Sequence, residues 1–342
     1  MANILILGAG AMGTAFSFPC SDNGHSVVIV GTHLENDFID QIKSSKKHPA
    51  LNCEISKNVT FSKFEKLQEE INKKIDLIVV AVISKGIEWA AAELSKVMKN
   101  NVPVLILTKG LSIHNDNYEV LAHKMQRLLK NNGIKETNIS AAGGPCLAKE
   151  LANKAHTSVV FANNDIKAVE QISKLVSTDY YHVSTSNDVI GVETCAAIKN
   201  IFSMAVGASQ GLCDSTKSKE KNYLNTAAAL IQESIYEMIT FVEKLKGKKE
   251  TVIGLAGIGD LYVSADGGRN SKMGEYLGKG IKFKEAKKTK MPNITVEGAD
   301  LALEIGAKVK KDFDIKTLPL MISMINTICE EKPLKVDWKN FK

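Results

Sequence analysis

The sequence predicts an α/β protein in which a doubly wound, Rossmann-type sheet domain precedes an all-α C-terminal domain. Residues 4–7 form an apolar run that leads directly into a G-x-G-x-x-G motif at residues 8–13. Apolar runs and helical patterns then alternate to about residue 187, which is typical of a parallel sheet with crossover helices. Beyond this point only helical patterns follow. We therefore expect a dinucleotide-binding domain at 1–187 and a helical substrate domain at 188–342.

The glycine motif is expected to bind a dinucleotide. Gly8 permits a tight turn, Gly10 lets the backbone approach a pyrophosphate, and Gly13 lets the next helix pack closely on the strand. A second apolar run at 26–30 lies at the distance expected for a βαβ unit. Free N–H groups at the start of the helix, which runs to about Asp22, would hold the phosphates. The alternative is a glycine-rich turn that binds no ligand.

The remaining apolar runs predict further buried parallel strands, and the amphipathic patterns predict helices. The expected strands are 77–82, 104–107, 139–142, 159–161 and 180–183. The clearest expected helices are 63–72, 85–99, 189–210, 225–246, 271–277, 297–308 and 318–331. Residues 217–221 are expected to form a polar loop.

The composition is typical of a soluble globular protein, with 44% hydrophobic and 24% charged residues. The N-terminus lacks the features of a signal peptide, and no apolar run reaches the length of about 18 residues that a membrane span needs. We therefore expect a cytoplasmic protein. Six scattered cysteines form no C-x-x-C pair and are expected to be reduced. The histidine spacing predicts no metal site.

The charge pattern argues against nucleic acid as a partner. The net charge of +6 is spread along the chain, and the lysine runs near 246–249 and 284–290 are not interleaved with aromatic residues. Two of the 44 basic residues are arginines. Arg127 is expected on the outer face of an amphipathic helix. Arg269 lies in a glycine-rich turn before a helix, where a planar guanidinium and a helix N-terminus would hold a phosphate.

One lysine lies within an otherwise apolar helix. Between Val189 and Cys213 only Glu193 and Lys199 are charged. Lys199 either extends to the surface or is buried, and burial would lower its pKa so that it exchanges a proton near neutral pH. Asp260 is then either a helix cap or the charge partner of this lysine.

Six motifs occur in an order found in one enzyme family. They are Gly8–Gly13, Thr108–Leu111, Gly144–Glu150, Gly191–Asn200, Gly259–Asn270 and Val296–Gly298. On these motifs the chain resembles the NAD(P)-dependent glycerol-3-phosphate dehydrogenases to about residue 305. The resemblance implies reversible oxidation of sn-glycerol 3-phosphate to dihydroxyacetone phosphate with NADP or NAD, a reaction that links glycerophospholipid and carbohydrate metabolism.

The resemblance also implies a role for each matching residue. Lys199 matches the acid/base on the C2 oxygen, Asp260 its carboxylate partner, and Lys109 a lysine that contacts substrate and cofactor. The implied substrate contacts, with Arg269 and Asn270 on the phosphate, are Lys109, Gly144, Cys146, Asn200, Asp260, Arg269 and Asn270. The implied cofactor contacts are Gly8, Gly10, Ala11, Met12, Gly13, Thr32, Lys109, Ala148, Arg269, Thr295 and Glu297.

The chain departs from the family pattern at three positions. Cys146 stands where serine is common, so a hydroxyl contact to the substrate is weakened or lost. Ile83 replaces a common proline near the nicotinamide side of the implied pocket. Gly268 replaces a serine found in many bacterial members.

The end of the second strand bears on the choice of cofactor. NAD enzymes usually place Asp or Glu there, on the ribose 2′-hydroxyl. Here no carboxylate follows until Glu35, and nothing obvious repels a 2′-phosphate. Thr32 and His33 can bind that phosphate, so NADP or dual use is favoured. His33 is equally well explained as an exposed loop residue.

Two other functions fit parts of the sequence. A related β-hydroxyacid or sugar-phosphate dehydrogenase would share the two-domain plan, although the phosphate site at Arg269 argues against a plain hydroxyacid. A non-catalytic dinucleotide sensor would not need Lys109, Lys199 and Asp260 together. The apolar helical half predicts a homodimer.

Overall fold

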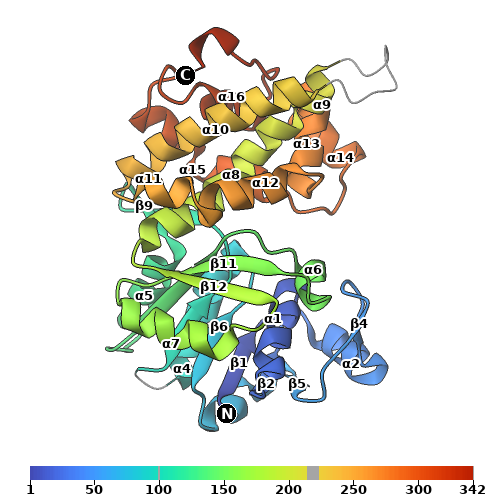
Figure 1. Ribbon diagram of the computed structural model, residues 1–342, viewed down its shortest axis with the longest axis vertical. Helices are drawn as coiled ribbons and strands as arrows, with labels where there is room; N and C mark the ends of the chain where they lie inside the picture. Colours follow the sequence, from blue (N-terminus) through green and yellow to red (C-terminus); the bar gives the residue numbers. More distant parts are fainter. Residues whose placement is uncertain (99–100, 214–222, 342) are drawn as a thin grey trace. The chain divides into compact units, whose positions relative to one another are not determined.

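The computed structural model describes residues 1–98, 101–213 and 223–341, and they form two compact units (Figure 1). Unit 1 consists of Met1–Lys109 and Val120–Val189, and unit 2 of Gly110–Glu119 and Ile190–Lys342. The chain therefore passes from unit 1 to unit 2 directly after Lys109. The polar loop expected at 217–221 lies outside the described residues.

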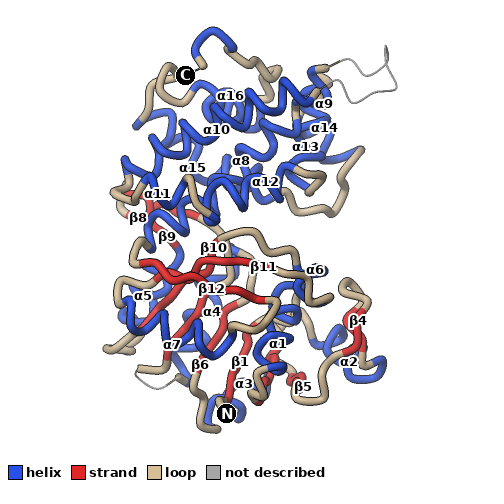
Figure 2. Tube along the Cα trace, viewed as in Figure 1, coloured by secondary structure: helices blue, strands red, loops and turns tan. Residues whose placement is uncertain are grey.

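Unit 1 is built on one eight-stranded sheet, with helices on its faces (Figure 2). In spatial order its strands are β12 (Tyr181–Ser186), β11 (Thr157–Ala162), β10 (Asn138–Gly143), β7 (Pro103–Ile106), β6 (Leu77–Val80), β1 (Asn3–Leu7), β2 (Ser26–Val30) and β5 (Val59–Ser62). The strands from β10 to β5 are parallel. The prediction that all the strands are parallel is wrong at β11, which pairs antiparallel with β10. The five-residue helix α6 lies between these two strands in the sequence. It is shorter than the crossover helix that a parallel pair needs.

Seven α-helices connect the strands in the part of unit 1 that the structure describes. They are α1 (Ala11–Asp22), α2 (Asn36–Ser45), α3 (Leu67–Asn72), α4 (Ile87–Val97), α5 (Leu121–Asn131), α6 (Ala148–Ala152) and α7 (Ile166–Val176). Two 3₁₀ turns, η1 (Phe64–Lys66) and η2 (Ser84–Gly86), precede α3 and α4. Two-residue strands β3 (Lys47–His48) and β4 (Cys53–Glu54) pair beside α2.

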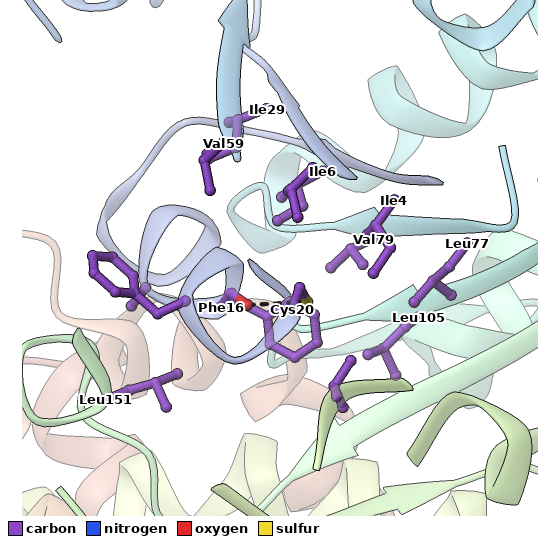
Figure 3. Packing of buried hydrophobic residues seen from close by; sticks show 14 of the residues in the cluster. Ile4, Ile6, Phe16, Cys20, Ile29, Val59, Leu77, Val79, Leu105 and Leu151 are labelled. Carbon is purple, nitrogen blue, oxygen red and sulfur yellow. Dashed lines mark hydrogen bonds between the residues drawn. The ribbon is translucent and has the colours of Figure 1, made fainter. Parts of the chain in front are cut away.

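The core of unit 1 forms around the first helix and the first strand. Residues 13–21 of α1 are buried throughout, and Ile4 and Ile6 of β1 are fully buried (Figure 3). The Phe16 ring meets Tyr181 of β12 edge-on with centroids 6.1 Å apart. This packing holds the N-terminus of α1 at the carboxyl end of β1, where the glycine motif lies.

In its described residues, unit 2 is helical apart from one β-hairpin. Its helices are α8 (Val189–Gly207), α9 (Ser209–Leu212), α10 (Leu224–Lys244), α11 (Lys249–Val252), α12 (Asp260–Ala265), α13 (Arg269–Gly278), α14 (Phe283–Thr289), α15 (Glu297–Asp312) and α16 (Pro319–Cys329), with a π-helical turn η4 (Leu255–Gly259) and a 3₁₀ turn η5 (Trp338–Asn340). Lys284, Lys287 and Lys288 lie on α14 and Lys290 directly follows it, and all but Lys287 are exposed.

The hairpin of β8 (Leu111–His114) and β9 (Asn117–Val120) was not expected from the sequence. It is anchored to α15 through Asp116, whose carboxylate oxygens accept hydrogen bonds from Lys311 Nζ at 2.6 Å and Lys308 Nζ at 3.4 Å. These bonds lower the pKa of Asp116. The segment that directly follows Lys109 is therefore fixed to unit 2.

The long helix at the centre of unit 2 is both apolar and enclosed. Residues 189–212 have a mean hydropathy of 1.4 over their most apolar window, which is enough to cross a membrane by length and composition. However, 94% of that window is buried within the structure. We therefore interpret this segment, which includes α8, as the core helix of unit 2.

Glycines allow α8 and α13 to make backbone contact. A Cβ atom on Gly274 would overlap the Met204 carbonyl oxygen, and a Cβ on Gly207 would overlap the Ser271 carbonyl oxygen. The close approach brings the first turn of α13 against α8.

We predict that Gly274→Ala lowers the free energy of unfolding by about 3 kcal/mol, because the backbone at Met204 cannot move away without opening the core. Gly10→Ala is the matched control, since its Cβ would meet no atom within 4 Å. Denaturant unfolding followed by circular dichroism measures both. Equal stability of the two variants would contradict the packing described here.

Candidate functional site

The glycine loop has the geometry of a phosphate cradle. Gly8 has φ +112°, and a Cβ there would lie 2.7 Å from the Ala81 carbonyl oxygen, after β6. The strand order reverses between β1 and β6, which is where doubly wound sheets bind ligands. A Cβ on Gly10 would meet open space, and α1 begins at Ala11 with no acidic residue in its first turn. This loop and the backbone of Met12 and Gly13 therefore fit a dinucleotide pyrophosphate.

The turn after β2 places a carboxylate next to the end of that strand. The position of this residue in the sequence did not indicate that it would lie there. Glu35 Oε2 accepts hydrogen bonds from Thr32 N at 2.7 Å and from Ala9 N at 3.1 Å. The turn after β2 therefore brings the Glu35 carboxylate back to the strand end, next to the glycine loop. His33 is exposed, and its ring lies 5.1 Å from the Trp89 ring.

Lys109 and the implied substrate loop meet at the carboxyl edge of unit 1. Lys109 Nζ donates a hydrogen bond to the Gly144 carbonyl oxygen at 3.2 Å. Gly144 has φ +103°, which only glycine adopts readily. Half-buried Cys146 follows, and Ala148 begins α6. Unit 1 thus brings Lys109, Gly144 and Cys146 to the ends of β7 and β10.

In unit 2, Lys199 is buried and paired. Its side chain is 7% exposed, and Nζ lies 2.8 Å from Asp260 Oδ1, whose side chain is 3% exposed. Lys199 Nζ also donates a hydrogen bond to Ser264 Oγ. Of the two possibilities that the sequence left open for each residue, the structure supports a buried lysine and a carboxylate that is its charge partner.

The local fold explains how the carboxylate reaches the lysine. The π-helical turn η4 ends at Gly259, and α12 begins with Asp260. Asp260 and Ser264 are four residues apart on α12, so they lie on one helix face. Sequence analysis assigned no role to Ser264, although its i,i+4 spacing from Asp260 was the signal that could have found it.

A side-chain amide connects three helices beside this pair. Asn270 Nδ2 donates to Asn200 Oδ1 at 3.0 Å, and Asn270 Oδ1 accepts from Gly298 N at 2.9 Å. Asn270 thus links α8, α13 and the start of α15, and it is only 7% exposed. The first residue of α13 is Arg269, two residues before the start at 271 that the sequence predicts.

The implied phosphate and cofactor residues of unit 2 are also close to one another. The Arg269 guanidinium forms an ion pair with Glu297 Oε1, and the two side chains are 58% and 38% exposed. Thr295, two residues before Glu297, is exposed. It lines a cavity of about 290 Å³ together with Lys287 and Asp300. Arg269 is therefore accessible to an anionic ligand, at the N-terminus of a ten-residue helix.

Two family models cover nearly all of the chain. A model described as NAD-dependent glycerol-3-phosphate dehydrogenase N-terminus matches residues 3–169, and one described as the C-terminus of the same enzyme matches residues 188–337. The chain belongs to the NAD-dependent glycerol-3-phosphate dehydrogenase family.

Individual members of the family are similar over most of their length. An NADP(+)-dependent glycerol-3-phosphate dehydrogenase of Archaeoglobus fulgidus is 31% identical over 83% of this chain and 82% of its own. A glycerol-3-phosphate dehydrogenase [NAD(P)+] of Francisella tularensis subsp. novicida is 30% identical over 90% and 88%. The crystal structure of the Coxiella burnetii glycerol-3-phosphate dehydrogenase superposes with a TM-score of 0.81, at 25% identity over 97% and 96% of the two chains.

We predict that Lys199→Met lowers the free energy of unfolding by about 3–5 kcal/mol, because it leaves the Asp260 carboxylate buried without its counter-charge. The double variant Lys199→Met/Asp260→Leu should recover most of that loss, since no buried charge remains. Denaturant titration of the three proteins measures the difference. A double variant less stable than the single one would contradict the buried-pair description.

Proposed function

We propose that this protein is an NAD(P)-dependent oxidoreductase that interconverts sn-glycerol 3-phosphate and dihydroxyacetone phosphate. The observation that carries the proposal is the buried Lys199–Asp260 pair on the helical unit of a glycerol-3-phosphate dehydrogenase family member. A buried lysine next to a carboxylate is a proton donor and acceptor held at one position. A plain sensor of dinucleotides has no need of it.

Residues 1–187, apart from the segment 110–119 that belongs to unit 2, act as the dinucleotide-binding domain in this proposal. The glycine loop at Gly8–Gly13 and the N-terminus of α1 bind the pyrophosphate, and Lys109, held by the Gly144 carbonyl, contacts substrate and cofactor. Ala11, Met12, Thr32 and Ala148 supply further cofactor contacts. When bound, the nicotinamide supplies or accepts the hydride at C2 of the substrate.

Residues 188–342 act as the substrate domain. During reduction, protonated Lys199 donates a proton to the C2 oxygen as the carbonyl becomes an alcohol. During oxidation, neutral Lys199 removes the hydroxyl proton. Asp260 and Ser264 hold the amine in place. Burial favours the neutral amine and Asp260 favours the charged one, so Lys199 can serve both directions.

Arg269 binds the substrate phosphate, and Asn270 fixes the side chain of Asn200 beside Lys199. The bond from Gly298 N to Asn270 ties the Thr295–Glu297 segment to the same framework. In this arrangement Asn270 is mainly a positioning residue. The substrate phosphate is bound by Arg269 and by the N–H groups at the start of α13.

We also infer a cytoplasmic homodimer. A reducing compartment is supported by the six cysteines, none of which forms a disulfide. Exposed apolar side chains on unit 2, among them Leu224, Tyr262 and Leu303, support a subunit contact there. Sedimentation velocity of the purified protein tests the dimer, and a single monomeric species would exclude it.

We predict that Lys199→Ala lowers kcat for dihydroxyacetone phosphate reduction by about 10³-fold, because proton transfer to the C2 oxygen is lost. Dinucleotide binding should remain, since the cradle belongs to unit 1. Steady-state kinetics and calorimetric titration with the oxidised cofactor measure the two properties. Wild-type turnover in this variant would refute the assignment.

We predict that Arg269→Ala raises KM for dihydroxyacetone phosphate by about 100-fold, because a charge-assisted contact to the phosphate is lost. Arg127→Ala is the matched control, since Arg127 is the other arginine of the chain and lies on α5 of unit 1. Initial-rate kinetics compare the two variants. An equal effect of both substitutions would remove Arg269 from the phosphate site.

A further inference from the structure

The chain leaves unit 1 at the residue that is implied to contact both substrate and cofactor. Lys109 ends the first segment of unit 1, and Gly110 begins the segment of unit 2 that contains the β8–β9 hairpin. Within unit 1, Lys109 Nζ donates a hydrogen bond to the Gly144 carbonyl oxygen at 3.2 Å. The position of the Lys109 backbone therefore depends on how firmly unit 2 holds the hairpin that follows.

The sequence forms this hairpin around a tight turn of two residues. β8 ends at His114 and β9 begins at Asn117, so only Asn115 and Asp116 connect the strands. Their φ angles are 49° and 56°. A type I′ turn needs left-handed backbone at both central positions, and asparagine and aspartate tolerate it. Asn117 Nδ2 also donates to the Asn115 carbonyl oxygen at 2.9 Å. The turn thus places Asp116 at the tip of the hairpin.

The tip is bound to the last turns of α15 by two charged hydrogen bonds. Asp116 Oδ2 accepts from Lys311 Nζ at 2.6 Å, and Asp116 Oδ1 accepts from Lys308 Nζ at 3.4 Å. We call these two bonds the tip contact. The Lys308 side chain is only 9% exposed, and its Nζ also lies 3.0 Å from Asp312 Oδ2. Lys308 is thereby fixed within α15 before it contacts the hairpin.

An aromatic ring holds the second strand of the hairpin beside the tip contact. Tyr118 of β9 meets Phe241 of α10 edge-on, with ring centroids 5.2 Å apart. Lys308 Nζ lies over the same Tyr118 ring, 5.1 Å from its centroid. Leu111 of β8 is 1% exposed. The hairpin is therefore held by α10 through a ring and by α15 through charges.

The helix that binds the tip also begins at the implied phosphate and cofactor residues. Glu297, the first residue of α15, forms an ion pair with Arg269. Gly298 N donates to Asn270 Oδ1 at 2.9 Å. Lys308 lies about 15 Å further along the same helix, at a rise of about 1.5 Å per residue. One helix of unit 2 thus connects these residues with the segment that directly follows Lys109.

We propose that the tip contact positions Lys109 for the reaction, by fixing the residues that follow it to α15. The inference rests on the proposed function, because it assigns positioning residues to that reaction. Lys109 is the group that contacts substrate and cofactor there. Asp116, Lys308 and Lys311 act only through it.

The variant Asp116→Asn tests the proposal, because asparagine tolerates the left-handed backbone of the turn but carries no charge. Hydrogen–deuterium exchange should be faster at residues 109–119, since the hairpin opens more often. The kcat for dihydroxyacetone phosphate reduction should fall about tenfold, because a displaced Lys109 no longer matches the reacting geometry. The dissociation constant of the oxidised cofactor should stay within about twofold, as the glycine cradle belongs to unit 1.

Glu330→Gln is the matched control on the same helix. Glu330 follows α16 and accepts hydrogen bonds from Lys310 of α15 and from Lys332, whose Nζ lies 2.5 Å from Oε2. These lysines lower the pKa of Glu330 to about 2, and the pKa of Asp116 is lowered by its own lysines. Both carboxylates are therefore charged at neutral pH.

The control removes a comparable carboxylate without touching the hairpin, so its kcat should stay within about twofold of wild type. Lys311→Gln and Lys310→Gln repeat the comparison from the lysine side, and Lys311→Gln alone should lower kcat. Thermal melting checks that all four variants fold. A purely structural role for these surface ion pairs would give the two variants of each comparison the same kcat.

Three results would overturn the inference. They are unchanged exchange at residues 109–119 in Asp116→Asn, faster exchange there with wild-type kcat, and an equal loss of kcat in Asp116→Asn and Glu330→Gln. The proposed function would fail separately, through a wild-type protein that does not reduce dihydroxyacetone phosphate. In that case exchange at Lys109 and Gly110 decides whether the tip contact positions the lysine.

Discussion

The buried ion pair between Lys199 and Asp260 is the constraint around which unit 2 is organised. Removing both charges from water costs several kcal/mol per ion, which mutual attraction offsets only when the geometry is fixed. The structure fixes the positions of both Lys199 and Asp260. Glycine contacts bring α13 against α8, and the turn η4 directs the start of α12 toward the lysine. A site that holds an amine under these conditions is suited to proton transfer, and much of the helical packing serves that placement.

Unit 1 binds its ligand by a different principle. Backbone N–H groups and a helix N-terminus provide the phosphate cradle at the switch point between β1 and β6. Charged side chains contribute at the edges, as Lys109 does against the Gly144 carbonyl.

Local patterns predicted most of the fold, because buried strands and amphipathic helices leave a periodic record in the sequence. The run Ser26–Val30 and the helix ending at Asp22 have the bounds that were expected. The direction of β11 and the hairpin after Lys109 depend on pairing with distant segments, which periodicity does not encode. The same holds at the site. The sequence motifs identified Lys199 and Asp260 as candidates, whereas the return of Glu35 to the glycine loop and the use of Asn270 as a link between helices follow only from tertiary contacts.

The central claim is that a phosphorylated three-carbon ketone is reduced at a buried lysine. The most direct test is the oxidation of NADH and NADPH by the purified protein with dihydroxyacetone phosphate, with unphosphorylated dihydroxyacetone as the comparison. We expect fast oxidation that requires the phosphate, with at least one of the two cofactors. Dinucleotide binding without turnover, or equal rates with and without the phosphate, would contradict it.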